Sequence, residues 1–418
     1  MNYNNQIFNK IILPPSKSIS QRAIVAALLS DGISSILNRG NDNDTLAAIR
    51  MAESLGASVD KDGNAWVIKG SNGIINNSLN IGESGLGLRM FSFIAALSGK
   101  EVYITGEGTL PGRPVDMLGD ALKQGGVSVE TSRGGLPIKL SGKLQGGDFN
   151  IDGSITSQVL TGLLMALPVV ENDSIVHVES LKSKPYIDLT LDILKDFGIV
   201  VKNVDYKEFF IRGKQQYKSV DYWVEGDWSG AAFWFVAGAI SGDIYIGGLN
   251  TASKQADRMI LDAMESGGIP VVFSKGYYHV KKSKVRSFNF DATDCPDLIP
   301  VLCLLAACAE GMSSISGASR LKFKESDRAL VLKQEFAKVG ISVFVENDLI
   351  RVEGGRIGGG LIDCHNDHRI AMTFLIASLV AEAEITIDNP GCINKSYPEF
   401  ILQFAFYLEY IKKSRSGD

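Results

Sequence analysis

Histidine and cysteine are scarce in this chain of 418 residues, which contains four histidines and five cysteines. The cysteine count is odd, and all five lie in the last third of the chain, beginning at Cys295. In a chain this long, that pattern indicates reduced thiols in a cytoplasmic protein rather than a disulfide framework. The segment from Cys364 to His368 has a spacing typical of metal ligands, but no second Cys/His pair matches it, so we expect no metal site.

Long apolar runs and an excess of basic residues are also absent. No stretch of about 18 residues is apolar throughout, so we expect no membrane-spanning helix. The Asn-rich start, residues 1–10, lacks the apolar segment of a signal peptide, and we therefore expect a cytoplasmic location. Lys plus Arg number 42 and Asp plus Glu number 47, a net charge of -5, so a nucleic-acid partner is not expected. A few convergent cations could still bind small anions.

What the chain does contain is an internal repeat of about seventy residues. In five segments a glycine follows an amphipathic helix pattern and precedes a β-rich run. These are Gly56, Gly126, Gly198, Gly268 and Gly340, separated by 70, 72, 70 and 72 residues. Glycine provides the left-handed C-cap that lets a helix turn into a strand. Ala-rich apolar segments recur in phase with these glycines and predict buried helices at 23–29, 88–97, 159–167, 231–240, 298–309 and 370–380.

These recurrences describe six units, each reading helix, strand, helix, strand, strand. The chain is too long for one simple core, so we expect an α/β protein of two domains with three units each. The sheets are expected outside and the Ala-rich helices inside.

Most candidate functional residues stand where a buried helix begins. Helix N-termini present free N–H groups and a positive dipole to phosphate and carboxylate, although N-capping by Ser, Thr or Asp is an alternative explanation. At the start containing Ser229 we favour capping. At the start containing Lys17 and Arg22 we favour anion binding, because two cations in about one turn exceed what a cap needs. A further charged segment, Lys322 to Arg328, either points toward a cleft or forms a solvated helix start. Prolines at helix N1 do not explain the cations beside them, as at Arg113.

Eight strings along the chain resemble, in order, the motifs of the 3-phosphoshikimate 1-carboxyvinyltransferase (EPSP synthase) family of enolpyruvyl transferases. They are Pro14 to Ala23, Gly106 to Pro114, Thr156 to Gln158, Ser183 to Asp188, Val224 to Asp227, Lys324 to Arg328, Asn366 to Met372 and Lys395 to Pro398. The resemblance implies a two-domain inside-out α/β barrel built from six βαβαββ repeats. It places the first domain at 16–226 and the second at 1–15 plus 227–418, closing over a cleft.

The resemblance also implies an activity, which is transfer of the enolpyruvyl group of phosphoenolpyruvate to the 5-hydroxyl of shikimate 3-phosphate. No cofactor, no metal and no macromolecular partner is expected, and we expect a monomer. Carried over position by position, the shikimate 3-phosphate ligands are Lys17, Ser18, Arg22, Thr156, Ser157, Gln158, Ser183, Tyr186, Asp297 and Lys324. The phosphoenolpyruvate ligands are Lys17, Gly85, Arg113, Gln158, Arg328, Arg369 and Lys395. Asp297 would take the hydroxyl proton, Glu325 would protonate the methylene carbon, and Lys17 would lie between the substrates.

Some positions depart from the usual family pattern. Leu86 and Gly87 replace a small hydroxylated and a small apolar residue, Met90 replaces a common proline, and Thr156 replaces serine. Arg320 or Lys322 falls where other members can have a neutral substrate contact. These changes would affect the shape of the cleft and the response to inhibitors more than the type of reaction.

Two other functions compete with this one. A sister transferase acting on a UDP-sugar typically has Lys-Asn in place of Lys17-Ser18, and often a reactive cysteine before the position of Arg113. No cysteine precedes Cys295 here. A non-catalytic relative that binds sugar phosphates would be expected to lack Asp297 or Glu325, and both are present.

Overall fold

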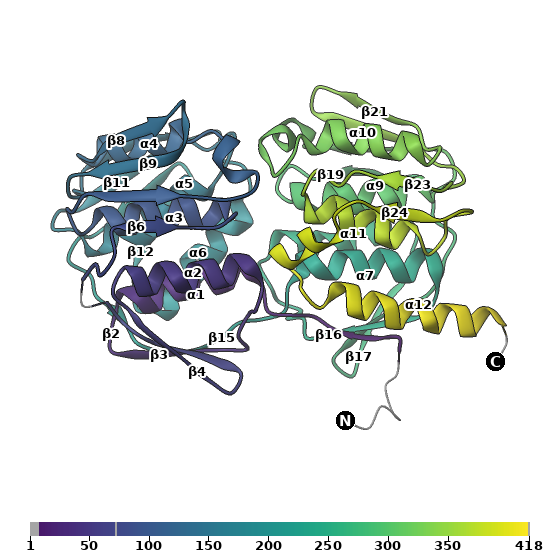
Figure 1. The fold of residues 1–418 in the computed structure, drawn as a ribbon, viewed down its shortest axis with the longest axis horizontal. Helices are drawn as coiled ribbons and strands as arrows, with labels where there is room; N and C mark the ends of the chain where they lie inside the picture. The colour runs from purple at the N-terminus through teal and green to yellow at the C-terminus, as the bar shows by residue number, and fades with distance from the viewer. Residues whose placement is uncertain (1–7, 72, 417–418) are drawn as a thin grey trace. The chain divides into compact units, whose positions relative to one another are not determined.

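The computed structural model describes residues 8–71 and 73–416. The chain divides into two units (Figure 1), which we call unit 1 (Met1–Pro14 and Gly226–Asp418) and unit 2 (Pro15–Glu225). The domain boundaries expected from the sequence, at residues 16 and 227, stay a prediction. Most of the Asn-rich start of the chain, where no signal peptide is expected, lies outside the described residues.

Unit 2 contains three similar four-stranded sheets. In each, the first two strands are parallel and the remaining pairs are antiparallel. The sheets, in spatial order, are β15 (Asp221–Trp223), β3 (Ile33–Leu37), β5 (Ala65–Lys69) and β4 (Ser58–Asp62); β6 (Ser78–Asn80), β7 (Val102–Thr105), β9 (Gly135–Ser141) and β8 (Ser128–Ser132); and β10 (Asp148–Asp152), β11 (Ser174–Glu179), β13 (Glu208–Ile211) and β12 (Val201–Val204). A short pair joins β2 (Ser30–Asp31) to β14 (Tyr217–Lys218).

Two kinds of helix alternate between these strands. The helices α1 (Lys17–Leu29), α3 (Gly85–Ala96) and α5 (Gln158–Ala166) are buried on nearly all sides, as expected for the Ala-rich segments. The helices α2 (Asn43–Ser54), α4 (Asp116–Gln124) and α6 (Lys184–Asp196) bury one face only. The helix α3 begins three residues before the expected start at 88, because the side chain of Ser84 caps it by accepting the N–H of Gly87 at 3.0 Å.

Unit 1 repeats the arrangement twice and then shortens it. Its sheets are β1 (Lys10–Ile12), β16 (Ile244–Gly247), β18 (Tyr277–Val280) and β17 (Val271–Ser274); β19 (Asn289–Asp291), β20 (Met312–Ser316), β22 (Leu349–Glu353) and β21 (Val343–Glu346); and a pair, β23 (Gly360–Ile362) and β24 (Ile385–Ile387). The buried helices are α7 (Trp228–Ser241), α9 (Ile299–Ala307) and α11 (His368–Ala377), and the others are α8 (Ile260–Ser266), α10 (Arg328–Lys338) and α12 (Phe400–Ser416).

The sixth unit therefore differs from the expectation of six equal units. After β24 the chain forms a 3-10 helix, η6 (Pro390–Lys395), and then α12, with no hairpin in the part of the chain that is described. The sequence agrees with this difference, because Gly340 is the last of the five repeat glycines. The α/β architecture is confirmed, and strand pairing among the described residues closes no barrel.

The repeat glycines end the amphipathic helices as predicted. All five have positive φ, between 76° at Gly268 and 101° at Gly56. The residue after each glycine donates its N–H back across the last turn, as Ala57 does to the carbonyl of Ala52 at 2.9 Å. This is the Schellman arrangement, which glycine adopts without steric cost. Within the described residues, no helix combines the length and apolar character needed to cross a membrane.

Candidate active site

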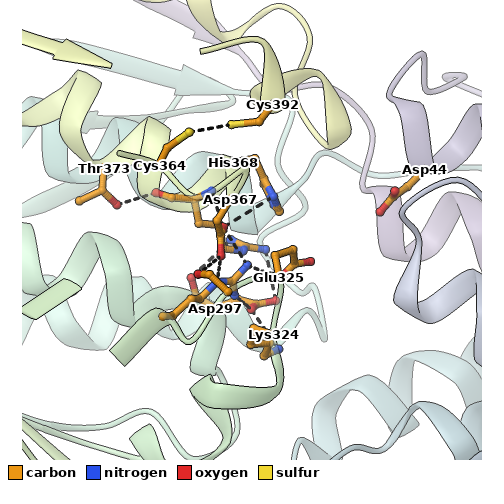
Figure 2. Close-up of polar contacts among 12 residues, drawn as sticks. Asp44, Asp297, Lys324, Glu325, Cys364, Asp367, His368, Thr373 and Cys392 are labelled. Atoms are coloured by element: carbon orange, nitrogen blue, oxygen red, sulfur yellow. Dashed lines mark hydrogen bonds and ion pairs between the residues drawn. The ribbon is translucent and has the colours of Figure 1, made fainter. Parts of the chain in front are cut away.

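A buried arginine links three carboxylates in unit 1. Arg328 is the first residue of α10, and only 1% of its side chain is exposed. Its Nη1 donates to Oδ1 of Asp297 at 2.7 Å, and its Nη2 donates to Oε2 of Glu325 at 2.6 Å. Its Nε donates to Oδ2 of Asp367 at 2.7 Å. Figure 2 shows these carboxylates converging. The structure thus groups both residues expected to transfer protons around one cation.

Asp297 is surrounded by further cations. It lies on the 3-10 helix η4 (Pro296–Leu298), just before α9. Lys324 Nζ lies 3.1 Å from its Oδ1, and Arg369 Nη2 lies 3.2 Å from its Oδ2. Burial by itself would raise the pKa of Asp297, but Arg369, Lys324 and Arg328 together hold that pKa well below its usual value. Asp297 is therefore an ionised carboxylate in the structure described.

The start of α11 contributes a carboxylate, Asp367, and a guanidinium, Arg369, to this cluster. The side chain of Asp367 caps the helix by accepting the N–H of Arg369 at 3.0 Å, and it also accepts a hydrogen bond from Ser326 Oγ at 3.1 Å.

Lys395 ends η6 and is buried. Lys324 lies after the 3-10 helix η5 (Ala318–Phe323), and burial lowers its pKa although Asp297 opposes the shift.

In unit 2, candidate residues gather where α1 begins. Lys17 Nζ lies 2.9 Å from Oδ2 of Asp44, a nearly buried carboxylate in the first turn of α2. The side chain of Ser16, the N-cap residue, makes no capping hydrogen bond to α1. The capping alternative therefore does not account for this helix start.

Arg22 lies one turn further along α1 and is fully buried. Its Nε donates to Thr190 Oγ1 at 2.9 Å, its Nη1 to the Ser18 carbonyl at 2.8 Å and its Nη2 to Thr161 Oγ1 at 3.4 Å. Another weak contact, at 3.5 Å, reaches the Tyr186 carbonyl. Burial among these neutral oxygens lowers the pKa of Arg22 to about 10. A buried cation surrounded by neutral acceptors favours an incoming anion, because the anion restores some of the interaction lost with water.

Gly85 and Arg113 lie in close contact. A Cβ atom placed on Gly85 would be 2.7 Å from Nη1 of Arg113 and 3.1 Å from its Cζ. Arg113 follows the 3-10 helix η1 (Leu110–Gly112), which contacts β9. Only glycine allows the guanidinium to lie this near the N-terminus of α3.

The remaining unit 2 candidates lie at the starts of α5 and α6. Thr156 Oγ1 accepts the N–H of Gln158 at 3.2 Å, and Ser157 between them is buried. Ser183 has a left-handed backbone with φ of 56° and precedes α6, where its carbonyl accepts the N–H of Tyr186 at 3.1 Å. Through Arg22, the helices α1, α5 and α6 are joined by hydrogen bonds.

Three further residues discussed from the sequence are Ser229, Arg320 and Lys322. Capping at the start of α7 is confirmed, since Asp227 accepts the N–H of Ser229 at 3.3 Å. Arg320 is buried and donates to the carbonyl of Thr293, whereas Lys322 is exposed with its ammonium 4.9 Å from the centre of the Phe323 ring.

In the segment from Cys364 to His368, the thiol of Cys364 lies near a second thiol. Cys364 Sγ lies 3.7 Å from Cys392 Sγ and 3.4 Å from the carbonyl of Asn389. Among residues 8–71 and 73–416, no three His, Cys, Asp or Glu side chains are placed to hold a metal ion. All five cysteines lie in the described residues and are thiols.

Sequence reasoning missed two carboxylates that contact candidate cations. Asp367 stands inside a recognised string, and its position before α11 could have identified it as an N-cap, but nothing local indicates its bond to Arg328, 39 residues away. Asp44, the partner of Lys17, stands in the first turn of a helix beginning at Asn43, where acidic residues are common.

Comparisons with known proteins identify the family of the chain. Residues 2–404 match the family model described as EPSP synthase (3-phosphoshikimate 1-carboxyvinyltransferase). The 3-phosphoshikimate 1-carboxyvinyltransferase of Clostridium novyi is 37% identical over 414 residues, covering 96% of this chain and 95% of that protein. That of Clostridium kluyveri is 38% identical over 395 residues, covering 94% and 93%.

Solved structures lead to the same fold. The EPSP synthase of Acinetobacter baumannii superposes with a TM-score of 0.77 at 25% identity, covering 94% of each chain. The enolpyruvyl transferase NikO of Streptomyces tendae has a TM-score of 0.75 at 18% identity, covering 95% of this chain and 94% of that one, and this likeness concerns the fold alone. The chain belongs to the EPSP synthase (3-phosphoshikimate 1-carboxyvinyltransferase) family.

Proposed function

We propose that this protein transfers the enolpyruvyl group of phosphoenolpyruvate to the 5-hydroxyl of shikimate 3-phosphate and releases phosphate, as a step of aromatic amino-acid biosynthesis. The observation that carries this function is the family match across residues 2–404. The clustering of catalytic residue types in the structure supports it, because Asp297 and Glu325 share Arg328.

Shikimate 3-phosphate is assigned ligands that lie mainly in unit 2. Arg22 is buried among neutral oxygens, and Ser18 and Tyr186 are joined to it through their carbonyls. This geometry supports binding of an anionic group, such as the phosphate of shikimate 3-phosphate. The other assigned ligands are Lys17, Thr156, Ser157, Gln158 and Ser183 from unit 2, and Asp297 and Lys324 from unit 1.

Phosphoenolpyruvate is assigned a largely cationic set of ligands. In unit 2 these are Lys17, Gly85, Arg113 and Gln158, and in unit 1 they are Arg328, Arg369 and Lys395. The guanidinium group matches carboxylate and phosphate with two parallel hydrogen bonds, which a lysine cannot do. The proximity of Gly85 to Arg113 supports their assignment to one ligand group.

The reaction proposed is an addition followed by an elimination. Glu325 gives a proton to the methylene carbon of phosphoenolpyruvate while the 5-hydroxyl oxygen attacks the adjacent carbon, and Asp297 takes the hydroxyl proton. The product of this addition is a tetrahedral ketal. Elimination then returns a proton from the new methyl group to Glu325, breaks the bond between carbon and the phosphate oxygen, and restores the double bond, while the proton held by Asp297 leaves with the phosphate. Two carboxyls in different surroundings can divide this work.

The cations around Asp297 have a consequence for its role as a base. Three cations contact its carboxylate, and they make it a weak proton acceptor in the structure described. Phosphoenolpyruvate would compete for Arg328 and Arg369, so its arrival would raise the basicity of Asp297. Asp297 would then become an effective base when phosphoenolpyruvate is present.

Several further properties belong to the same proposal. The protein would act in the cytoplasm, as a monomer, on two small-molecule substrates, with no nucleic-acid partner. The chemistry assigned to Asp297, Glu325 and Lys17 calls for neither a metal nor a cofactor.

The proposed function is tested by phosphate release from the purified protein supplied with phosphoenolpyruvate and one of three acceptors. These are shikimate 3-phosphate, unphosphorylated shikimate and a UDP-sugar. We expect turnover only with shikimate 3-phosphate. Turnover with the UDP-sugar would identify the sister activity instead, and absence of turnover with every acceptor would indicate a binding protein.

A further inference from the structure

The hydrogen-bond donors of Arg328 are divided between two edges of its guanidinium. On one edge, Nε donates to Oδ2 of Asp367 at 2.7 Å and Nη2 donates to Oδ1 of the same carboxylate at 3.2 Å. On the terminal edge, Nη1 donates to Asp297 at 2.7 Å and Nη2 to Glu325 at 2.6 Å. Asp367 therefore forms a bidentate pair along the side of the arginine, and the other two acids share its end.

The partners on the two edges differ in burial. The side chain of Asp367 is 0% exposed, whereas Glu325 is 12% and Asp297 is 22% exposed. Burial alone would lower the pKa of Arg328, but Asp367, Glu325 and Asp297 outweigh it and raise that pKa.

Two further hydrogen bonds fix the position of the Asp367 carboxylate. It caps α11 through the N–H of Arg369 at 3.0 Å and accepts the Ser326 hydroxyl at 3.1 Å. Moving its carboxylate away from Arg328 would uncap a buried helix. Asp297 and Glu325 can give up the arginine at less cost, because both are nearer to solvent.

We propose that Asp367 is a positioning residue that permanently holds the Nε edge of Arg328, so that phosphoenolpyruvate exchanges only with Glu325 and Asp297 on the terminal edge. This inference rests on the proposed function, in which Arg328 binds phosphoenolpyruvate. Asp367 itself does not contact the substrate. Its effect is to fix the plane in which the terminal nitrogens meet the incoming anion.

Two other roles for Asp367 predict different results. If it only neutralised Arg328, its removal would leave the cluster more positive and would strengthen the binding of an anionic substrate. If it only capped α11, its removal would lower stability and leave the Michaelis constants unchanged. The three roles are therefore separated by the direction of one kinetic constant.

The test is steady-state kinetics of Asp367→Asn, in which the amide keeps one oxygen for the helix cap but loses the bidentate pair. We expect the Michaelis constant for phosphoenolpyruvate to rise roughly tenfold to a hundredfold, the effect of a lost charge-assisted pair, with that for shikimate 3-phosphate unchanged. The matched control is Asp227→Asn. Asp227 caps α7, the corresponding helix of another repeat, through the N–H groups of Ser229 and Gly230. This control should lower stability only.

A milder variant covers the case in which Asp367→Asn fails to fold. Ser326→Ala removes only the hydroxyl bond to Asp367, and we expect it to raise the same Michaelis constant several-fold. A Michaelis constant for phosphoenolpyruvate that falls or stays unchanged in the variants that fold would overturn the proposal.

A second readout does not depend on activity. The Arg328 Nε–H proton should give an NMR signal protected from exchange with water, identified by its loss in Arg328→Lys. We expect Ser326→Ala to weaken that protection and Asp367→Asn to abolish it. If the parent protein shows no turnover, the proposed function fails, while this signal still reports on the contact. Protection that is unaffected by either variant would refute the positioning role.

Discussion

The contact between Gly85 and Arg113 gives the sharpest kinetic prediction. Gly85→Ala would place a methyl group 2.7 Å from Nη1, 3.1 Å from Cζ and 3.2 Å from Nη2 of Arg113. Unstrained contacts between such atoms lie at about 3.5 Å, so the guanidinium would have to move by roughly 0.8 Å. A displacement near 1 Å from a productive position can cost about a hundredfold. We therefore expect the Michaelis constant for phosphoenolpyruvate to rise roughly tenfold to a hundredfold.

Steady-state kinetics with each substrate varied in turn is the appropriate assay. The Michaelis constant for shikimate 3-phosphate should not change, because its assigned ligands do not include either residue. The structure offers a matched control in Gly112→Ala. Gly112 precedes Arg113, and a Cβ placed on it would meet no atom within 4 Å. Its substitution should leave both constants as they are. The reasoning would be refuted by an unchanged phosphoenolpyruvate constant in Gly85→Ala, or by an equal rise in the control.

Three further predictions concern the acids and the absence of metal. Glu325→Gln should lower turnover by roughly 10²–10⁴ with substrate affinities near normal, because the amide cannot supply the proton. The control Glu346→Gln, at the surface, should leave turnover unchanged. Near-normal turnover in Glu325→Gln would disprove Glu325 as the proton donor. Asp297→Asn should be less stable than the parent near pH 7 by about 3–5 kcal/mol, and the difference in urea midpoint should shrink as the pH falls below about 4. The direction follows because the pKa of Asp297 is lower in the folded protein than in the unfolded chain. Such a carboxylate stabilises the fold above its unfolded pKa, and this stabilisation is lost as the pH falls through its folded pKa. A difference in stability that does not depend on pH would contradict this. Thorough chelation should leave turnover intact, and a loss restored by zinc would revive the Cys364–His368 site.

The repeat could be predicted from sequence because its signals are local. Each of the five glycines must adopt positive φ to end a helix, and an Ala-rich apolar segment can be recognised without knowing its neighbours. The sixth unit departs from the repeat, since among the described residues the buried helix predicted at 370–380 is not followed by a hairpin. The local sequence after β24 instead favours helix, and α12 forms.

The site itself depends on contacts between distant parts of the chain. Arg22 is bonded to Thr161 and Thr190, which are 139 and 168 residues away, and no local pattern encodes either contact. The pairing of Arg328 with Asp367 is of the same kind. Family resemblance could name Arg22 and Arg328 as ligands, but only the fold shows which neutral or acidic groups hold them before a substrate arrives.

The proposed activity requires that the protein joins two substrates rather than hydrolysing one. The most direct test is to follow phosphoenolpyruvate and shikimate 3-phosphate with the purified protein by ¹H and ³¹P NMR. The account predicts that both are consumed together, that inorganic phosphate appears in equal amount, and that new vinyl proton signals arise from an enol ether on the 5-oxygen. Phosphate released without that ether, or no change in either substrate, would contradict it.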